Sequence, residues 1–126
     1  MVHKVGVVGG GQLARMMIPP AIELGIEIGV LCESSESSAR VGLFTVGDHR
    51  DINSVLEFSK NFNVVTFDHE HVPQSVLAAL EETGIALRPG PGALKSSQDK
   101  IFMRGRLREL GIPQPLWDVA QTADDI

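Results

Sequence analysis

The residues best suited to chemistry form one short cluster, Asp-His-Glu-His at positions 68–71. Carboxylates and imidazoles at this spacing can act as an acid–base pair, and the same side chains are common metal ligands. The cluster follows the apolar run Val64–Phe67, which predicts a strand, and open α/β sheets bind ligands at the edge where such strands end. We expect Asp68 or Glu70 to contact a substrate. The alternatives are a metal site, which we do not adopt, and a solvated turn before a helix that begins at Pro73.

A second candidate site is the glycine turn Gly9–Gly11, which continues into Gln-Leu-Ala. It lies between a predicted strand and a predicted helix, in the G-x-G-x-x-A form of phosphate-binding turns. Glycines let the backbone approach an anion closely, and the amides at the start of the helix hold it. The alternative is a tight turn that needs glycine for its backbone conformation. Glu33 stands where NAD-binding domains place an acidic residue for the ribose, so an NAD-binding module is one hypothesis.

Basic residues recur along a predicted amphipathic helix over 98–110. Lys100, Arg104 and Arg108 are spaced at i, i+4 and i+8, which places them on one face of the helix. Beside a cleft, such a face contacts polyphosphate, whereas the alternative is a solvated basic surface. The sequence contains no Walker-type Gly-Lys-Ser/Thr element, and no Ser-His-Asp arrangement can be assigned.

Alternating strands and helices must position these residues. The apolar runs that predict strands are His3–Val8, Ile26–Leu31, Phe44–Val46, Val64–Phe67 and Ile85–Leu87. The runs with helical spacing are Leu13–Leu24, with Pro19-Pro20 kinking it, Asp51–Lys60, with Asp51 as its N-cap, and Pro73–Glu82. Nearly continuous apolar strands separated by helices are typical of a parallel sheet that is covered on both faces. The sequence therefore predicts an α/β, Rossmann-like, doubly wound domain.

The last thirty residues differ from the rest. We divide the chain into a Rossmann-like domain over 1–96 and, over 97–126, a linker helix with the start of a further domain. The turn-rich segment Arg88–Gly92 separates the expected helix over 98–110 from the sheet. After that helix, Leu116–Ala120 predicts a new strand, and residues 122–125 resemble the first turn of a further helix. A helix start with nothing behind it buries no apolar surface, so we expect a truncated chain.

Composition restricts the classes of function. The 126 residues are 43% hydrophobic and 21% charged, which fits one globular domain and excludes a disordered chain. The net charge of −5 argues against general nucleic-acid binding, and the single Cys32 excludes an internal disulfide. The apolar stretch Val5–Val8 is too short for a signal peptide or a membrane span. We expect a cytoplasmic protein with a small-molecule substrate and neither nucleic-acid nor membrane partners.

Three blocks of sequence together resemble one family. The blocks are residues 9–16, 66–73 and 97–113, and the resemblance follows the whole chain in the same order. The family is the 5-(carboxyamino)imidazole ribonucleotide synthases, ATP-grasp ligases of purine biosynthesis. The resemblance implies a pre-ATP-grasp domain whose parent enzyme uses ATP, Mg²⁺ and bicarbonate to carboxylate 5-aminoimidazole ribonucleotide. It also implies a homodimer when full length, and a fragment that is inactive without the ATP-grasp domain.

The resemblance also implies roles for particular residues. Gly11, Gln12 and Leu13 would lie on the substrate side. Glu70 would contact the amine or the ribose hydroxyls of the ribonucleotide. Lys100 stands where many members have an arginine that reaches ATP, and a lysine keeps the charge but not the bidentate fork. No catalytic residue and no metal ligand is assigned within the chain.

Two other hypotheses stay open. One is a sibling ATP-grasp enzyme, such as the formate-dependent glycinamide ribonucleotide transformylase. The sequence Gly-Gln-Leu-Ala-Arg-Met at residues 11–16 favours the synthase over this sibling. The other is a free-standing NAD-binding module, supported only by the glycine turn and Glu33, and we expect no appreciable binding of NAD(H).

Overall fold

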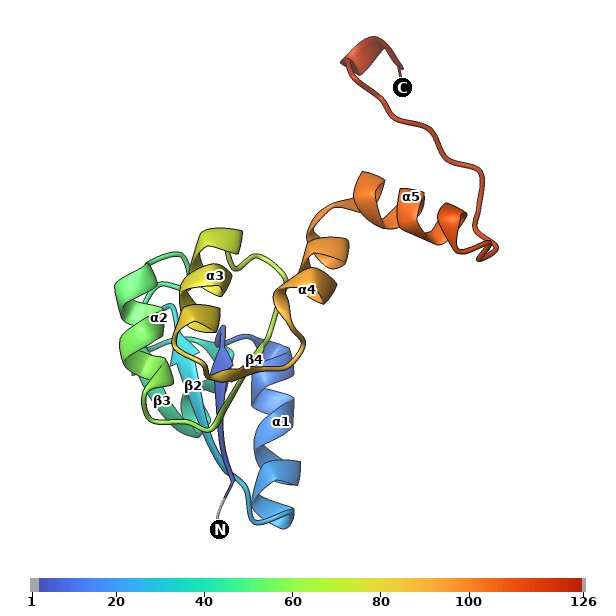
Figure 1. The fold of residues 1–126 in the computed structure, drawn as a ribbon. Helices are drawn as coiled ribbons and strands as arrows, with labels where there is room; N and C mark the ends of the chain where they lie inside the picture. Colours follow the sequence, from blue (N-terminus) through green and yellow to red (C-terminus); the bar gives the residue numbers. More distant parts are fainter. Residues whose placement is uncertain (1–2, 126) are drawn as a thin grey trace.

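Five parallel strands form a single sheet in the order β3-β2-β1-β4-β5 in a computed structural model, which describes residues 3–125 (Figure 1). The strands are β1 (Lys4–Val8), β2 (Glu27–Cys32), β3 (Leu43–Val46), β4 (Val64–Phe67) and β5 (Ala86–Leu87). The chain runs outward from β1 to β3, returns to place β4 on the other side of β1, and then continues outward to β5. The direction of winding therefore reverses between β1 and β4, which confirms the predicted doubly wound α/β class.

Helices cover both faces of this sheet. They are α1 (Gln12–Glu23), α2 (Ile52–Ser59), α3 (Gln74–Glu82) and α4 (Pro91–Gln98), with the short 3₁₀ helix η1 (Ser38–Val41). Helix α5 (Lys100–Glu109) and the 3₁₀ helix η2 (Ala123–Asp125) follow outside these layers. Val8 belongs to the apolar cluster beneath α2 and α3, whereas its neighbour Val7 belongs to the cluster beneath α1. Because successive side chains of a strand point to opposite faces, a continuous apolar strand fills both clusters.

The first two helices lie where the sequence predicts them. Asp51 caps α2 by accepting hydrogen bonds from the amides of Asn53 at 3.4 Å and Ser54 at 2.9 Å. Helix α1 continues through Pro19 and Pro20 instead of ending there. Burial of Ile18 and Ala21, on either side of the proline pair, stabilises this continuation by tertiary packing.

The segment after β5 differs from the prediction. A turn-rich break was expected over 88–92 and one helix over 98–110, but α4 already begins at Pro91 and the chain changes direction at Asp99. Proline suits the first turn of a helix, and α4 is held to the sheet by the buried side chain of Leu94. Asp99 then caps α5 by accepting a hydrogen bond from the amide of Phe102 at 2.9 Å. The predicted boundary at 96/97 falls within α4.

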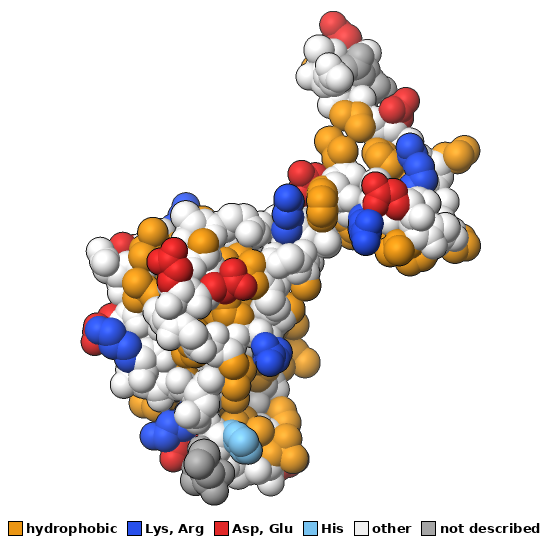
Figure 2. Space-filling view, viewed as in Figure 1, with side chains coloured by type: hydrophobic (Ala, Val, Ile, Leu, Met, Phe, Trp, Pro, Cys, Tyr) orange, Lys and Arg blue, Asp and Glu red, His pale blue; other side chains and the backbone are white. Residues whose placement is uncertain are grey.

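Helix α5 and the residues after it extend away from the sheet (Figure 1). None of the residues of α5 is buried, although the amphipathic pattern over 98–110 predicted an apolar face that packs inward. Apolar side chains lie on the surface of this part of the molecule (Figure 2). Residues 116–120 form no strand, because no neighbouring strand is present among the described residues to pair with them. Within residues 3–125, no helix has the length and apolar character needed to cross a bilayer.

Candidate functional site at the carboxyl ends of β1 and β4

The two candidate segments meet where the strand order reverses. Val8 of β1 is paired with Phe67 of β4, so the glycine turn 9–11 and the loop 68–73 leave the sheet side by side. The amide of Asp68 donates to the carbonyl oxygen of Val8 at 2.9 Å and fixes this junction. Ligands of open α/β sheets bind in the crevice outside such a reversal point.

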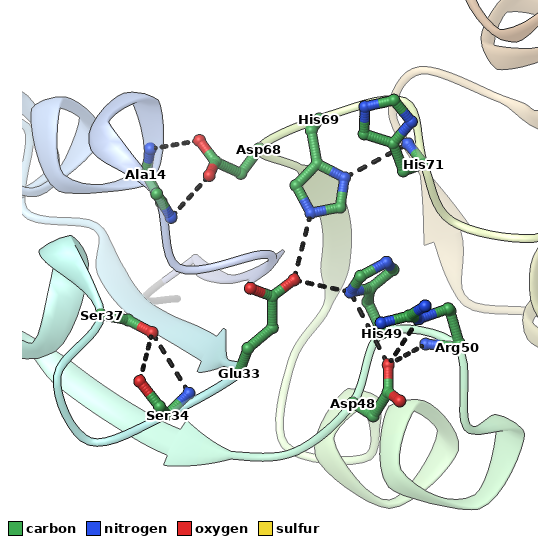
Figure 3. Close-up of polar contacts among 11 residues, drawn as sticks. Ala14, Glu33, Ser34, Ser37, Asp48, His49, Arg50, Asp68, His69 and His71 are labelled. Carbon is green, nitrogen blue, oxygen red and sulfur yellow. Dashed lines mark hydrogen bonds and ion pairs between the residues drawn. The ribbon is translucent and has the colours of Figure 1, made fainter.

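Asp68 joins the loop to the start of α1 (Figure 3). Its Oδ2 accepts a hydrogen bond from the amide of Gly11 at 2.6 Å, and its Oδ1 accepts one from the amide of Ala14 at 2.7 Å. The side chain is buried. The carboxylate thus occupies the positive end of the helix, where a bound phosphate would otherwise lie. Asp68 thus joins the loop 68–73 to the start of α1. Glu70 is then the carboxylate of this loop to which the predicted substrate contact applies.

Internal packing accounts for the three glycines of the turn. Gly9 has a φ of +104°, and a Cβ at this position would lie 2.9 Å from the Cβ of Asp68. A Cβ on Gly10 would lie 2.6 Å from the Sγ of the buried Cys32, and one on Gly11 would overlap the Asp68 carboxylate. The tight-turn interpretation therefore explains the motif without a ligand. Substrate binding by Gly11 stays a prediction.

A cluster of Glu33, His49 and His69 lies beside this junction, and the sequence reasoning did not identify it (Figure 3). The three residues follow β2, β3 and β4. His49 Nδ1 lies 2.8 Å from Glu33 Oε1, His69 Nε2 lies 3.7 Å from the same oxygen, and the two rings meet edge to face. The available signal was a polar residue after each of three parallel strands, because those strand ends share one edge of the sheet. Glu33, considered above as a ribose ligand, faces two imidazoles instead.

The hydrogen bond at His69 argues against a metal centre in this cluster. His69 Nδ1 accepts a hydrogen bond from the amide of His71 at 3.2 Å, and an amide N–H can only donate. In the neutral tautomer that this bond favours, the proton is on Nε2, the nitrogen that faces Glu33, so a metal at Nε2 would require the proton to move to Nδ1 and the bond from His71 to break. Glu33 and His49 alone are too few ligands for the three or four that protein zinc sites use.

The stability of the fold should decrease below neutral pH because of His49. Burial, followed by the charge of His69, lowers the pKa of His49 from its usual 6.5, although Glu33 and Asp48 oppose this and Arg50 adds to it. The unfolded chain then binds this proton more readily than the folded chain, so the free energy of unfolding falls as the pH drops through 6.5 toward the lower pKa. Urea unfolding of the wild type and His49→Asn across this range measures the effect. A smaller pH dependence is expected in the variant, and equal slopes would contradict the assignment.

Glu70 projects from the middle of the loop and is half-buried. Its own backbone amide, followed by the charges of His71, Lys100 and His69, lowers the pKa of this carboxyl group, so Glu70 is ionised at neutral pH. The positive charge of Lys100, the first residue of α5, is one of the smaller contributions to this lowering.

The other predicted residues lie further along the same rim or away from it. On α1, Gln12 Oε1 accepts a hydrogen bond from Ser38 Oγ at 3.1 Å, and Leu13 is exposed. The guanidinium group of Arg108 lies 4.7 Å from the centre of the Trp117 ring, so it packs on the C-terminal segment. Arg104 is half-buried, and its backbone carbonyl accepts from Gln114 Nε2 at 3.1 Å.

The sheet order and the helices on both of its faces define a Rossmann-like domain, and its candidate ligand site lies at the reversal point, on the carboxyl edge of the sheet. Residues 2–98 match the model of the ribonucleotide synthetase preATP-grasp domain, and the match ends at the last residue of α4. The chain belongs to this family of preATP-grasp domains.

Relatives of known sequence and structure agree with this assignment. The chain is 42% identical over 123 residues to the N5-carboxyaminoimidazole ribonucleotide synthase of Corynebacterium ammoniagenes, covering 96% of this chain and 30% of the relative. The synthetase structure from Thermotoga maritima has a TM-score of 0.85 at 30% identity, covering 98% of this chain and 35% of the other. The Aspergillus clavatus synthase in complex with ADP and 5-aminoimidazole ribonucleotide has a TM-score of 0.76 at 34% identity, covering 91% and 31%. The chain thus spans about a third of the length of these relatives.

Proposed function

We propose that this chain forms the ribonucleotide-binding N-terminal domain of an N5-carboxyaminoimidazole ribonucleotide synthase. This ligase uses ATP to join bicarbonate to 5-aminoimidazole ribonucleotide in purine biosynthesis. The observation that carries the proposal is the Glu70 carboxylate on a loop that Asp68 fixes at the reversal point of the sheet. The names of the relatives and the ribonucleotide complex of the Aspergillus clavatus neighbour support it.

The residues of this chain bind and orient the ribonucleotide in this proposal. The Glu70 carboxylate accepts hydrogen bonds from the amine or the ribose hydroxyls, because an ionised carboxylate offers only acceptors. The loop that carries Glu70 is fixed by Asp68 at one end and by the fully buried Val72 near the other. Lys100, at the start of α5, extends the site toward ATP. We place the enzyme in the cytoplasm as a homodimer, as the resemblance implies.

ATP, Mg²⁺ and bicarbonate belong mainly to the ATP-grasp region in this proposal. The carboxylates of the rim do not suit Mg²⁺, which needs several oxygen ligands in octahedral geometry. Both oxygens of Asp68 already accept amide hydrogen bonds, and this leaves Glu70 as the remaining carboxylate of the loop. We therefore assign no metal ligand to this chain, and we expect residues 1–126 alone to be inactive.

The NAD-binding hypothesis has less support than the synthase. A dinucleotide-binding domain holds the pyrophosphate at the start of its first helix, and here Asp68 occupies that place. Glu33, which this hypothesis assigns to the ribose, has its Oε1 atom 2.8 Å from Nδ1 of His49. A thermal-shift titration with NADH should show no saturable change, and a saturable rise at micromolar concentration would favour the NAD-binding module.

The test of the proposed function uses the complete synthase. This term means residues 1–126 followed by the ATP-grasp region of the family, and that region is taken from the native gene or from the Corynebacterium ammoniagenes relative. Formation of ADP should require both 5-aminoimidazole ribonucleotide and bicarbonate. Glycinamide ribonucleotide with formate should not replace them. Turnover with that second pair, and not with the first, would assign the chain to the sibling transformylase.

A further inference from the structure

Gln98 makes the hydrogen bonds that hold the loop 68–73 from the side of α4. Its Nε2 donates to the carbonyl oxygens of Glu70 and Val72, both at 2.7 Å. Its Oε1 accepts from Gln74 Nε2, also at 2.7 Å, at the start of α3. A primary amide has two N–H donors, so both are used and their directions are set by the bond from Gln74.

These bonds act on the backbone of the residue that matters most for the proposed function. Glu70 lies between two fixed points, Asp68 and Val72, and its own carbonyl oxygen is one of the two that Gln98 holds. Without Gln98, the carbonyl groups of Glu70 and Val72 lose a strong partner in a partly buried place. The loop would then be free to rotate the Glu70 carboxylate away from its position on the rim.

Gln98 also lies at the junction between the sheet domain and α5. It is the last residue of α4, and it is followed by Asp99, which caps α5, and by Lys100, the predicted ATP-side cation. Gln98 therefore connects the start of α5 to the loop that carries Glu70.

We propose that Gln98 is a positioning residue for ribonucleotide binding, which acts by fixing the backbone that presents Glu70 at the junction with α5. This inference rests on the proposed function of Glu70. Gln98 itself touches no substrate. Its effect should appear in the binding of the ribonucleotide and should disappear when the Glu70 carboxylate is absent.

The test is a double-mutant cycle in the complete synthase. Gln98→Ala should raise the KM for 5-aminoimidazole ribonucleotide about tenfold, with the KM for ATP changed by less than about twofold. Gln98→Glu keeps the shape but turns a carboxylate oxygen toward two carbonyl oxygens, so it should be at least as severe. Gln74→Ala removes only the bond that orients the amide, and a rise of about twofold to threefold is expected. Circular dichroism and melting temperature confirm that each variant is folded.

The coupling between the two sites decides the inference. In a Glu70→Ala background, Gln98→Ala should change the KM for the ribonucleotide by less than about twofold, because the group that it positions is gone. Effects of Gln98→Ala and Glu70→Ala that add fully, or an equal loss for ATP, would overturn the positioning role. If Glu70→Ala alone leaves ribonucleotide kinetics unchanged, the proposed role of Glu70 fails instead. If Gln98→Ala does not fold, Gln74→Ala in the same cycle supplies the answer.

Discussion

Replacing Glu70 by Ala in the complete synthase should lower kcat/KM for 5-aminoimidazole ribonucleotide about tenfold to a hundredfold. The carboxylate is ionised at neutral pH, because its own amide and the nearby charges of His71, Lys100 and His69 lower its pKa. Its loss leaves the amine or hydroxyl donors of the substrate without their acceptor. The kinetic constants for ATP should change little, since the proposed function assigns most contacts with ATP to the ATP-grasp region.

Matched variants separate the charge of Glu70 from the shape of its loop. Glu70→Gln keeps an acceptor oxygen without the charge and should lose less than Glu70→Ala. His71→Ala changes the neighbouring exposed residue and should have a milder effect, because the backbone amide of His71 still donates to His69 Nδ1. Ribonucleotide kinetics that stay unchanged in Glu70→Ala would show that the loop is only a solvated turn.

Replacing Asp68 by Ala should destabilise the chain by about 2–3 kcal/mol. The change removes two short hydrogen bonds to a buried carboxylate, and it leaves the amides of Gly11 and Ala14 unpaired at the start of α1. The midpoint of urea unfolding of residues 1–126 should fall by roughly 1 M or more.

The control for Asp68 is Asp51→Ala. Asp51 also caps a helix, with bonds to Asn53 and Ser54, but its side chain is at the surface, where water can replace it. A clearly smaller shift of the midpoint is expected for Asp51→Ala. Equal shifts for the two variants would mean that Asp68 is an ordinary surface cap and does not hold the site together.

The pattern of apolar runs predicted the fold because the inner strands β1 and β2 bury successive side chains on both faces of the sheet. Runs such as Val5–Val8 contain no polar side chain, and this argues against a sheet with one solvated face. Asp51 was identified as a cap from its position before a helical run, and its two hydrogen bonds confirm it. These features depend on neighbours in sequence, so the sequence alone is sufficient to predict them.

Features that depend on distant residues were not predicted correctly. Helix α4 carries a weak apolar pattern, and it is recognised only when Leu94 is seen against the core. The strand expected at 116–120 needs a partner strand, which the described residues do not contain. In both places tertiary contacts, or their absence, decided the local structure.

The position of the candidate site was predicted from the sequence, but the separate roles of its residues were not. The Asp-His-Glu-His cluster was correctly placed at the end of β4. The sequence did not distinguish Asp68, which turns inward to α1, from Glu70, which stays on the rim, because alternation around a loop has no fixed period. The glycine turn was interpreted as an anion site, and only the structure shows the Asp68 carboxylate at the helix start.

The most direct test of the account is hydrogen–deuterium exchange of the complete synthase with ADP, in the absence and presence of 5-aminoimidazole ribonucleotide. If the loop at the reversal point holds the ribonucleotide, peptides that contain residues 68–73 should exchange more slowly when it is bound. The matched region at the C-terminal end of α2, which leads to the start of β4 at the opposite edge of the sheet, should be unchanged. Protection confined to the ATP-grasp region, with none at 68–73, would contradict the assignment of the ribonucleotide site to this chain.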